Sequence, residues 1–211
     1  SHFPASLAMF MLEVTWWSQR ALWHLMFSGV FERHPNLQWV NTESGTAWVP
    51  ETLAKLDSFY DRMKHSKYGS EAIFGGAAVA GMSLTPSEYW QRQCHVGASF
   101  LRPAEVNVVR SLGADKVMWG SDYPHIEGSH PYTDQHLRLT FGEMSTGEAT
   151  QILTTNAANI YKFDVAALQA LADEHCPTKA HVASGITYDE IPEMAKGCPG
   201  MAPHSQTQAA A

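Results

Sequence analysis

Apolar residues recur at helical spacing over residues 5–33. The residues that set the spacing are Leu7, Phe10, Val14, Trp17 and Ala21. Steps of three or four place these side chains on one face of a helix. Gly29 interrupts the pattern, and His34-Pro35-Asn36 is typical of a turn, because proline disfavours helix at the residue before it.

A second amphipathic pattern spans residues 46–63. Its apolar positions are Val49, Leu53, Leu56, Tyr60 and Met63. Their alternating steps of four and three predict a helix, and Pro50 suits its first turn. Residues 69–85 are rich in Gly and Ala and are interpreted as a loop. Thr85-Pro86-Ser87-Glu88 is typical of a helix start.

Three strands are predicted between the helices. They cover residues 37–41, 95–100 and 116–120. Further helices are predicted over 103–112, closed by Gly113 as a C-terminal cap, and over roughly 133–143 and 146–161. Strands that alternate with helices indicate parallel strands joined by crossovers, so the expected fold class is α/β.

Composition and charge narrow the function classes. The chain of 211 residues is 45% hydrophobic and 11% aromatic, which is enough for a sizeable core. A formal net charge of −7 provides no cationic surface for nucleic acid or an anionic membrane. The 3 cysteines lie far apart, which argues against a disulfide framework. We find no apolar run long enough to span a bilayer, and we expect a cytoplasmic protein.

The strongest candidate for chemistry is Asp122, which follows the last strand in Trp119-Gly120-Ser121-Asp122-Tyr123-Pro124-His125. Catalytic residues of parallel α/β folds project from the carboxyl ends of strands. A carboxylate there suits a divalent metal, or serves as a base toward water. The alternative is that Asp122 caps the following loop or helix.

Glu43 and His95 have weaker claims. Glu43 follows the strand 37–41, and it either takes part in a site or complements the positive end of helix 46–63. His95 begins its strand, where a histidine is more often only hydrogen-bonded than a ligand. We find no H-x-H or H-E-x-x-H and no G-x-S-x-G, so those hydrolase motifs are not supported.

Three stretches together resemble the amidohydrolase-2 group of the amidohydrolase superfamily. They are Ser28–Leu37 with Glu43-Ser44-Gly45, then Gln93–Phe100, then Val117–His125. Their order and separations match the family, and the resemblance covers residues 5–163. It implies that the chain is the C-terminal part of a distorted (β/α)8 barrel, and that the three strands are the last three of that barrel.

The resemblance also implies a site. One divalent metal ion, often zinc, is expected at the carboxyl-terminal mouth of the barrel. Asp122 matches the family's metal-contacting aspartate, so it is the expected catalytic residue and metal ligand. We expect the substrate, a small molecule, to be contacted by Glu43, His125, Trp119 and His95.

The chain departs from the family in its length and ligand set. The H-x-H pair of the first strand and the histidine of the fifth strand are not in the sequence. A barrel of this kind takes about 250 residues, so we expect either a piece of a longer protein or a decayed remnant. Residues 164–182 are predicted to form a peripheral helix and 183–211 a disordered tail. An open barrel edge would favour association, so a homo-oligomer is also expected.

These observations predict a metal-dependent hydrolase, in which a metal-activated water attacks a small-molecule substrate. Two alternatives stay open. The first is a non-oxidative, metal-dependent decarboxylase that uses the same site, since fold does not decide the reaction. The second is a non-catalytic partial barrel or interaction module.

Overall fold

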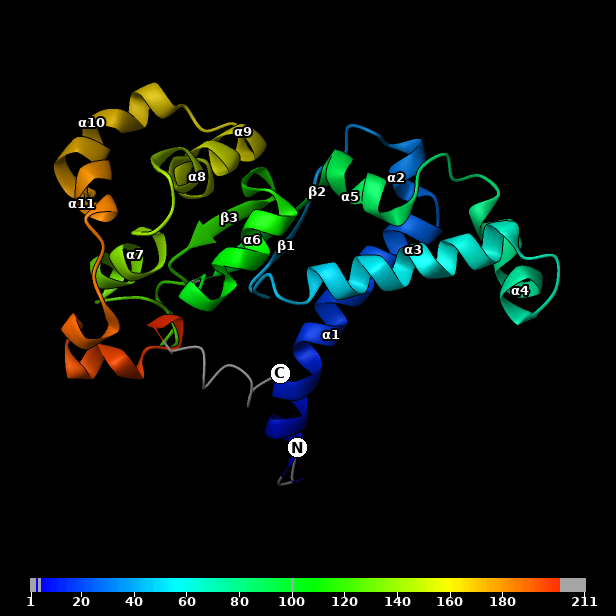
Figure 1. Ribbon diagram of the computed structural model, residues 1–211, viewed down its shortest axis with the longest axis horizontal. Coiled ribbons are helices and arrows are strands. Elements are labelled where there is room, and N and C mark those ends of the chain that lie inside the picture. Colours follow the sequence, from blue (N-terminus) through cyan, green and yellow to red (C-terminus); the bar gives the residue numbers. More distant parts are fainter. Residues whose placement is uncertain (1–2, 4, 100, 202–211) are drawn as a thin grey trace. The chain divides into compact units, whose positions relative to one another are not determined.

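The chain folds into two compact units, seen in a computed structural model that describes residues 3, 5–99 and 101–201. Unit 1 contains the chain up to Ser44 together with Trp48–His95. Unit 2 contains Gly45–Ala47 and the chain from Val96 onward. Figure 1 shows the elements of each unit, whose positions relative to one another are not determined.

Three strands form one sheet. Their order is β1-β2-β3, and they are β1 (Trp39–Thr42), β2 (Cys94–Ser99) and β3 (Val117–Gly120). The strand β2 begins in unit 1 and ends in unit 2. Helices precede and follow each strand, which confirms the predicted α/β class with three strands.

The helices carry most of the chain. Those of unit 1 are α1 (Ser6–Phe27), α2 (Val30–Arg33), α3 (Val49–His65), α4 (Ser70–Val79) and α5 (Pro86–Gln93). The α-helices of unit 2 are α6 (Val106–Leu112), α7 (Thr133–Phe141), α8 (Thr146–Thr150), α9 (Asn156–Tyr161), α10 (Val165–His175) and α11 (Lys179–Ala183). A π-helical stretch, Gln151–Thr155, joins α8 to α9.

The helix α3 buries the face that its sequence predicts. Val49, Leu53, Leu56 and Tyr60 are buried, and they lie at the predicted steps of four and three. The start of α5 is also as predicted. The Thr85 amide donates to Glu88 Oε2 at 2.7 Å in a capping box, and this hydrogen bond is the main cause that lowers the pKa of the Glu88 carboxyl.

The prediction of a loop over residues 69–85 is wrong, because α4 occupies Ser70–Val79. Glycine costs roughly 1 kcal/mol in a helix relative to alanine, so composition argues against a helix here. Tertiary packing overrides this preference. A Cβ atom on Gly75 would lie 2.0 Å from Met63 Sδ of α3, so the missing side chain permits the close approach of the two helices.

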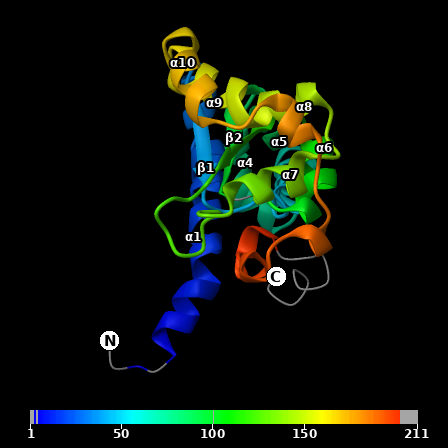
Figure 2. The same ribbon diagram turned by 90° about the vertical axis from the view of Figure 1, so that its left-hand side faces the viewer.

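The predicted helix over residues 5–33 forms, with the expected break at Gly29, but most of its apolar positions are exposed. Leu7, Phe10 and Trp17 are 68%, 61% and 54% exposed, whereas Leu22 and Met26 near its end are fully buried. In Figures 1 and 2 the amino-terminal turns of α1, drawn in dark blue, lie away from the other helices of unit 1. The apolar face is therefore a surface of unit 1 over most of its length.

In unit 2, β2 and β3 are parallel, and Val96 pairs with Val117 and Ser99 with Gly120. All four strand residues Val96, Ala98, Val117 and Met118 are buried. The helix α6 connects the strands and ends at Gly113, whose φ of 99° is a conformation that favours glycine. The predicted cap at Gly113 is thus confirmed.

The prediction of a disordered tail over 183–211 is wrong for its first part. Residues 188–201 form three short 3-10 turns, Tyr188–Glu190, Glu193–Gly197 and Pro199–Met201. Ile191, Ala195 and Met201 are buried there. Residues 202–211 lie outside the described residues. The predicted peripheral helix over 164–182 corresponds to two helices, α10 and α11.

None of the helices in the described part of the chain is long and apolar enough to cross a membrane.

The buried amide of Asn156 joins α9 to the start of β3. Its Nδ2 atom donates to the carbonyls of Ala114 and Val117, both at 2.7 Å. Asn156→Ala leaves both carbonyls without this donor, so we expect the free energy of unfolding to fall by about 1–3 kcal/mol. Urea unfolding measures this change. Asn159→Ala alters an exposed asparagine of the same helix, and an equal loss there would contradict the assignment.

Candidate functional site

Two of the residues selected from the sequence have a strained backbone. Asp122 has a φ of 59° and Glu43 a φ of 61°. Among the described residues other than glycine, Lys162 alone shares a positive φ, and it caps the end of α9. A left-handed residue with a side chain costs roughly 1–2 kcal/mol, and such strain persists where the surrounding structure enforces it, often at functional sites.

The loop after β3 is closed by its own backbone. The Ser129 amide donates to the Ser121 carbonyl at 2.9 Å, and the His125 amide donates to the Asp122 carbonyl at 2.8 Å. Gly128 is buried, and a Cβ atom there would lie 2.7 Å from the Ser121 carbonyl oxygen. The loop therefore has room only for glycine at this position, and its fold determines where Asp122 and His125 point.

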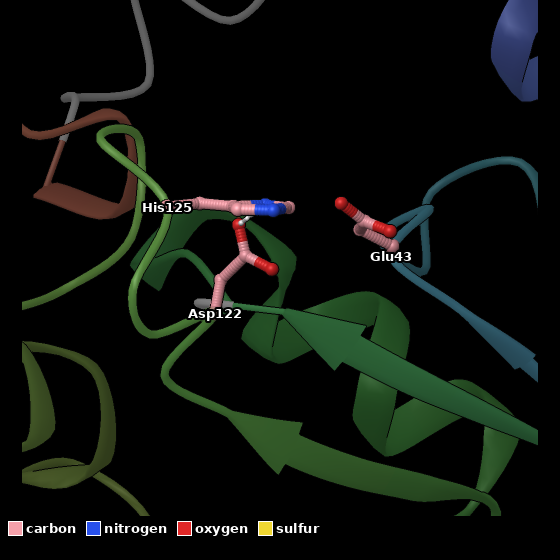
Figure 3. Close-up of side chains that lie close together, drawn as sticks. All are labelled: Glu43, Asp122 and His125. Carbon is pink, nitrogen blue, oxygen red and sulfur yellow. Dashed lines mark ion pairs between the residues drawn. The ribbon is translucent and has the colours of Figure 1, made fainter.

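Asp122 and His125 face each other at the end of β3 (Figure 3). The atoms His125 Nδ1 and Asp122 Oδ2 are 3.3 Å apart, with the Asp122 side chain 11% exposed and that of His125 56% exposed. Asp122 Oδ2 accepts no hydrogen bond from the described residues, so the imidazole lies within ion-pair distance without the orientation of a hydrogen bond.

This pair fits a divalent metal. A buried carboxylate oxygen that accepts no hydrogen bond is costly unless a ligand satisfies it, and carboxylate and imidazole are both common zinc ligands. Two ligands of a tetrahedral ion, each 2.0–2.2 Å from it, lie roughly 3.3–3.5 Å from each other. The observed 3.3 Å between Nδ1 and Oδ2 matches that separation.

The capping alternatives for Asp122 and Glu43 do not agree with the helix boundaries. The helix α7, which follows Asp122, has Tyr132 as its N-cap residue. The helix α3, which follows Glu43, has Trp48 as its N-cap residue and begins at Val49. A carboxylate stabilises the positive amino-terminal end of a helix only when it lies in or next to the first turn. Neither Asp122 nor Glu43 lies there.

Glu43 directly follows β1 in unit 1 and is exposed. Figure 3 draws its side chain. The turn that carries it is held by Asn41, whose Nδ2 atom donates to Ser44 Oγ at 2.9 Å. Asn41 itself is buried. The strained backbone of Glu43 thus belongs to an ordered turn at a strand end.

Glu105 is a buried carboxylate that the sequence analysis missed. Its Oε1 atom accepts from the Thr46 amide at 2.7 Å and from the Thr46 hydroxyl at 2.9 Å. Its Oε2 atom accepts from the Arg102 amide at 3.1 Å. Arg102-Pro103-Ala104-Glu105 has the spacing of a capping box. This pattern predicts the turn, but it predicts neither the burial of the Glu105 side chain nor its hydrogen bonds with Thr46.

Two other residues, His95 and Trp119, were predicted to contact the substrate. His95 is the second residue of β2, near its amino end, whereas catalytic residues of such folds follow the carboxyl ends. Its position gives the predicted substrate role no support. Trp119 stacks on His136 of α7, with ring centroids 6.0 Å apart. That packing is internal to unit 2, and the contact of Trp119 with substrate stays a prediction.

Glu105→Gln tests the anchoring of Thr46. The amide group of glutamine can accept from Thr46 with one end only, and its other end then places a donor against the Arg102 amide. We expect unfolding to become easier by about 1–3 kcal/mol and exchange of the Thr46 amide to accelerate. The matched control is Glu143→Gln, at an exposed glutamate. Equal stability of both variants would show that Glu105 does not anchor the turn.

Comparisons with known proteins show what the chain is similar to. The amidohydrolase family model matches residues 18–163, which is more than half of the chain. The crystal structure of an amidohydrolase from Mycobacterium avium subsp. paratuberculosis K-10 is similar in fold, with a TM-score of 0.51 and 22% sequence identity. The similarity covers 69% of this chain and 33% of that chain.

The chain therefore spans about a third of the length of that amidohydrolase. No curated protein matches the chain. The family match includes the strand ends that carry Glu43 and Asp122, and it confirms the resemblance inferred from the sequence motifs. On this evidence the chain belongs to the amidohydrolase family.

Proposed function

We propose that the protein is a metal-dependent hydrolase of a small-molecule substrate, with Asp122 as a metal ligand and the residue that handles the proton of the attacking water. The observation that carries this proposal is the state of Asp122. Its backbone is strained, its side chain is 11% exposed, and its Oδ2 atom accepts no hydrogen bond from the described residues. A buried, strained and unsatisfied carboxylate is typical of a functional group.

The chemistry divides between the ion and the side chains. A bound divalent ion lowers the pKa of water toward neutrality and polarises the bond under attack. Asp122 has two oxygens, so one can hold the ion while the other accepts a proton from the water. The Nδ1 atom of His125 lies 3.3 Å from Oδ2, which is close enough for His125 to share the ion. We propose that His125 instead contacts the substrate that the ion holds.

Glu43 completes the proposed set as a second substrate-binding residue. It is exposed and strained, and the family match extends over it. A carboxylate recognises hydrogen-bond donors such as hydroxyl, amide or ammonium groups. We leave His95 out of the proposed set, because it lies near the amino end of β2.

Asp122→Asn tests the metal role in the chain itself. We expect the unsubstituted chain to bind Zn²⁺ or Co²⁺ weakly, because Asp122 is its one residue that matches the family's ligands. The neutral amide should weaken binding by at least about tenfold, measured by calorimetry or by the visible absorption of Co²⁺. Asp173→Asn changes an exposed aspartate of α10 and should bind as the unsubstituted chain does. Unchanged affinity in Asp122→Asn would refute the metal role.

The reaction is tested on the natural protein that contains this chain. Amide and ester substrates are assayed for cleavage, and aromatic and unsaturated carboxylic acids for release of carbon dioxide. We expect cleavage, with kcat reduced by about a hundredfold or more in Asp122→Asn. Glu43→Gln should mainly raise KM, because it alters binding rather than proton transfer. Carbon dioxide release without hydrolysis would instead establish a decarboxylase.

A further inference from the structure

The C-terminal segment Ile186–Met201, called the clamp below, folds although its sequence resembles a tail. Ile191, Ala195 and Met201 are buried in one apolar cluster. Partly buried side chains pack against this cluster, and they are Tyr132, Leu139, Ile186, Tyr188 and Cys198. The clamp lies beyond residues 18–163, the part that matches the family model.

The clamp contacts the loop that carries Asp122. Cys198 Sγ donates to the carbonyl oxygen of Gly128 at 3.2 Å. Gly128 in turn lies against the loop's own carbonyls, and a Cβ atom there would be 3.0 Å from the Asp122 oxygen and 3.1 Å from the His125 oxygen. Tyr132, which packs on the apolar cluster, lies three residues after Ser129. The clamp thus contacts the loop at Gly128 and packs on the chain shortly after the loop, at Tyr132.

Three contacts hold residues 181–185, the segment just before the clamp, to α7. Arg138 Nη2 donates to the Gly185 carbonyl at 2.7 Å. The backbones of Gly142 and Gly185 lie so close that a Cβ atom on Gly142 would be 2.5 Å from Gly185 Cα. The Nε2 atom of His181 lies 2.7 Å from Oδ1 of Asp134. Figures 1 and 2 show the clamp, drawn in orange to red, next to α7.

We propose that the clamp positions the loop 121–129, and that Ile191 and Cys198 act as positioning residues for the Asp122–His125 pair. The outer part of the loop is exposed. Tyr123 is 67% exposed and Ile126 is 99% exposed, so the outer part of the loop buries little of its own surface. A short loop with exposed apolar side chains opens easily unless its base is held. The buried residues Gly128 and Ser129 form that base, and Cys198 of the clamp contacts it at the Gly128 carbonyl.

The contributions of the two positioning residues differ in kind. Ile191 is 3% exposed and supplies apolar contact area in the cluster. Cys198 supplies a thiol hydrogen bond, which is weak. Removal of the isoleucine side chain should therefore loosen the clamp more than removal of the thiol. The role of the loop in metal binding rests on the proposed function, whereas the mechanical role of the clamp does not.

Hydrogen exchange of the metal-free chain tests the mechanical role. The amides of His125, Gly128 and Ser129 report on loop closure, and those of β3 report on the stability of unit 2. We expect Ile191→Ala to accelerate the loop amides by about tenfold while the β3 amides change much less. For Cys198→Ala we expect the loop amides to exchange about threefold faster. Cys198→Ser should restore slow exchange, because a hydroxyl can donate to the Gly128 carbonyl.

Two matched controls belong to this experiment. Met194→Ala removes a side chain that is 83% exposed from the same segment, and Cys176→Ala removes an exposed thiol. Both should exchange as the unsubstituted chain does. Loop amides that stay slow in Ile191→Ala and Cys198→Ala would overturn the proposal. Equal acceleration of loop and β3 amides would also overturn it, because the clamp would then act only through overall stability.

Metal titration separates this inference from the proposed function. With Zn²⁺ as the probe, we expect Ile191→Ala to weaken binding by about tenfold, as the loss of an outer supporting contact typically does. If Asp122→Asn loses affinity for Zn²⁺ but Ile191→Ala does not, the metal site stands, and the claim that the clamp positions the metal-binding pair is refuted. Unchanged affinity in Asp122→Asn would refute the proposed function, and the exchange data would still decide the mechanical role.

Discussion

One backbone hydrogen bond, from the Ser129 amide to the Ser121 carbonyl, closes the loop after β3, and the candidate site depends on it. Closure holds Asp122 at a φ of 59°, a conformation that costs roughly 1–2 kcal/mol for a residue with a side chain. Ser129 is fully buried, so the bond is shielded from water and offsets that cost. Without closure, Asp122 would relax and its carboxylate would leave the side of His125.

The same constraint explains the composition of the loop. Gly128 lies against three carbonyl oxygens, and any larger residue would have to push the loop apart. Two of these oxygens belong to Asp122 and His125, so the fit at Gly128 is transmitted directly to the candidate metal site. The clamp supports this fit from outside, at the Gly128 carbonyl. Strain at Asp122 is thus maintained by a layer of contacts that carry no chemistry themselves.

Much of the fold could be predicted from the sequence, because periodicity reports burial where one element has one buried face. The apolar positions of α3 and the three strands are of this kind. Periodicity failed where packing is set by distant residues. The helix α4 contains Gly75, whose fit against Met63 no local pattern encodes, and the clamp is stabilised by single residues such as Ile191 rather than by a repeat.

The site was predictable to a similar extent. Asp122 and Glu43 could be selected because residues that follow strands of parallel sheets carry the chemistry of such folds, and both have the strained backbone of functional residues. Glu105 was missed, because its partner Thr46 is far away in sequence and a glutamate is expected on the surface. His95 was selected from its place at the start of a strand and Trp119 from its place just before Asp122. Neither criterion shows which way a strand residue faces, so both contacts stay predictions.

The metal-ligand role of Asp122 is tested most directly by crystallography, at the zinc absorption edge, of the zinc-loaded natural protein that contains this chain. The account predicts an anomalous peak about 2.0–2.2 Å from an oxygen of the Asp122 carboxylate. An ion bound by other residues, with the Asp122 carboxylate turned away from it, would contradict the account.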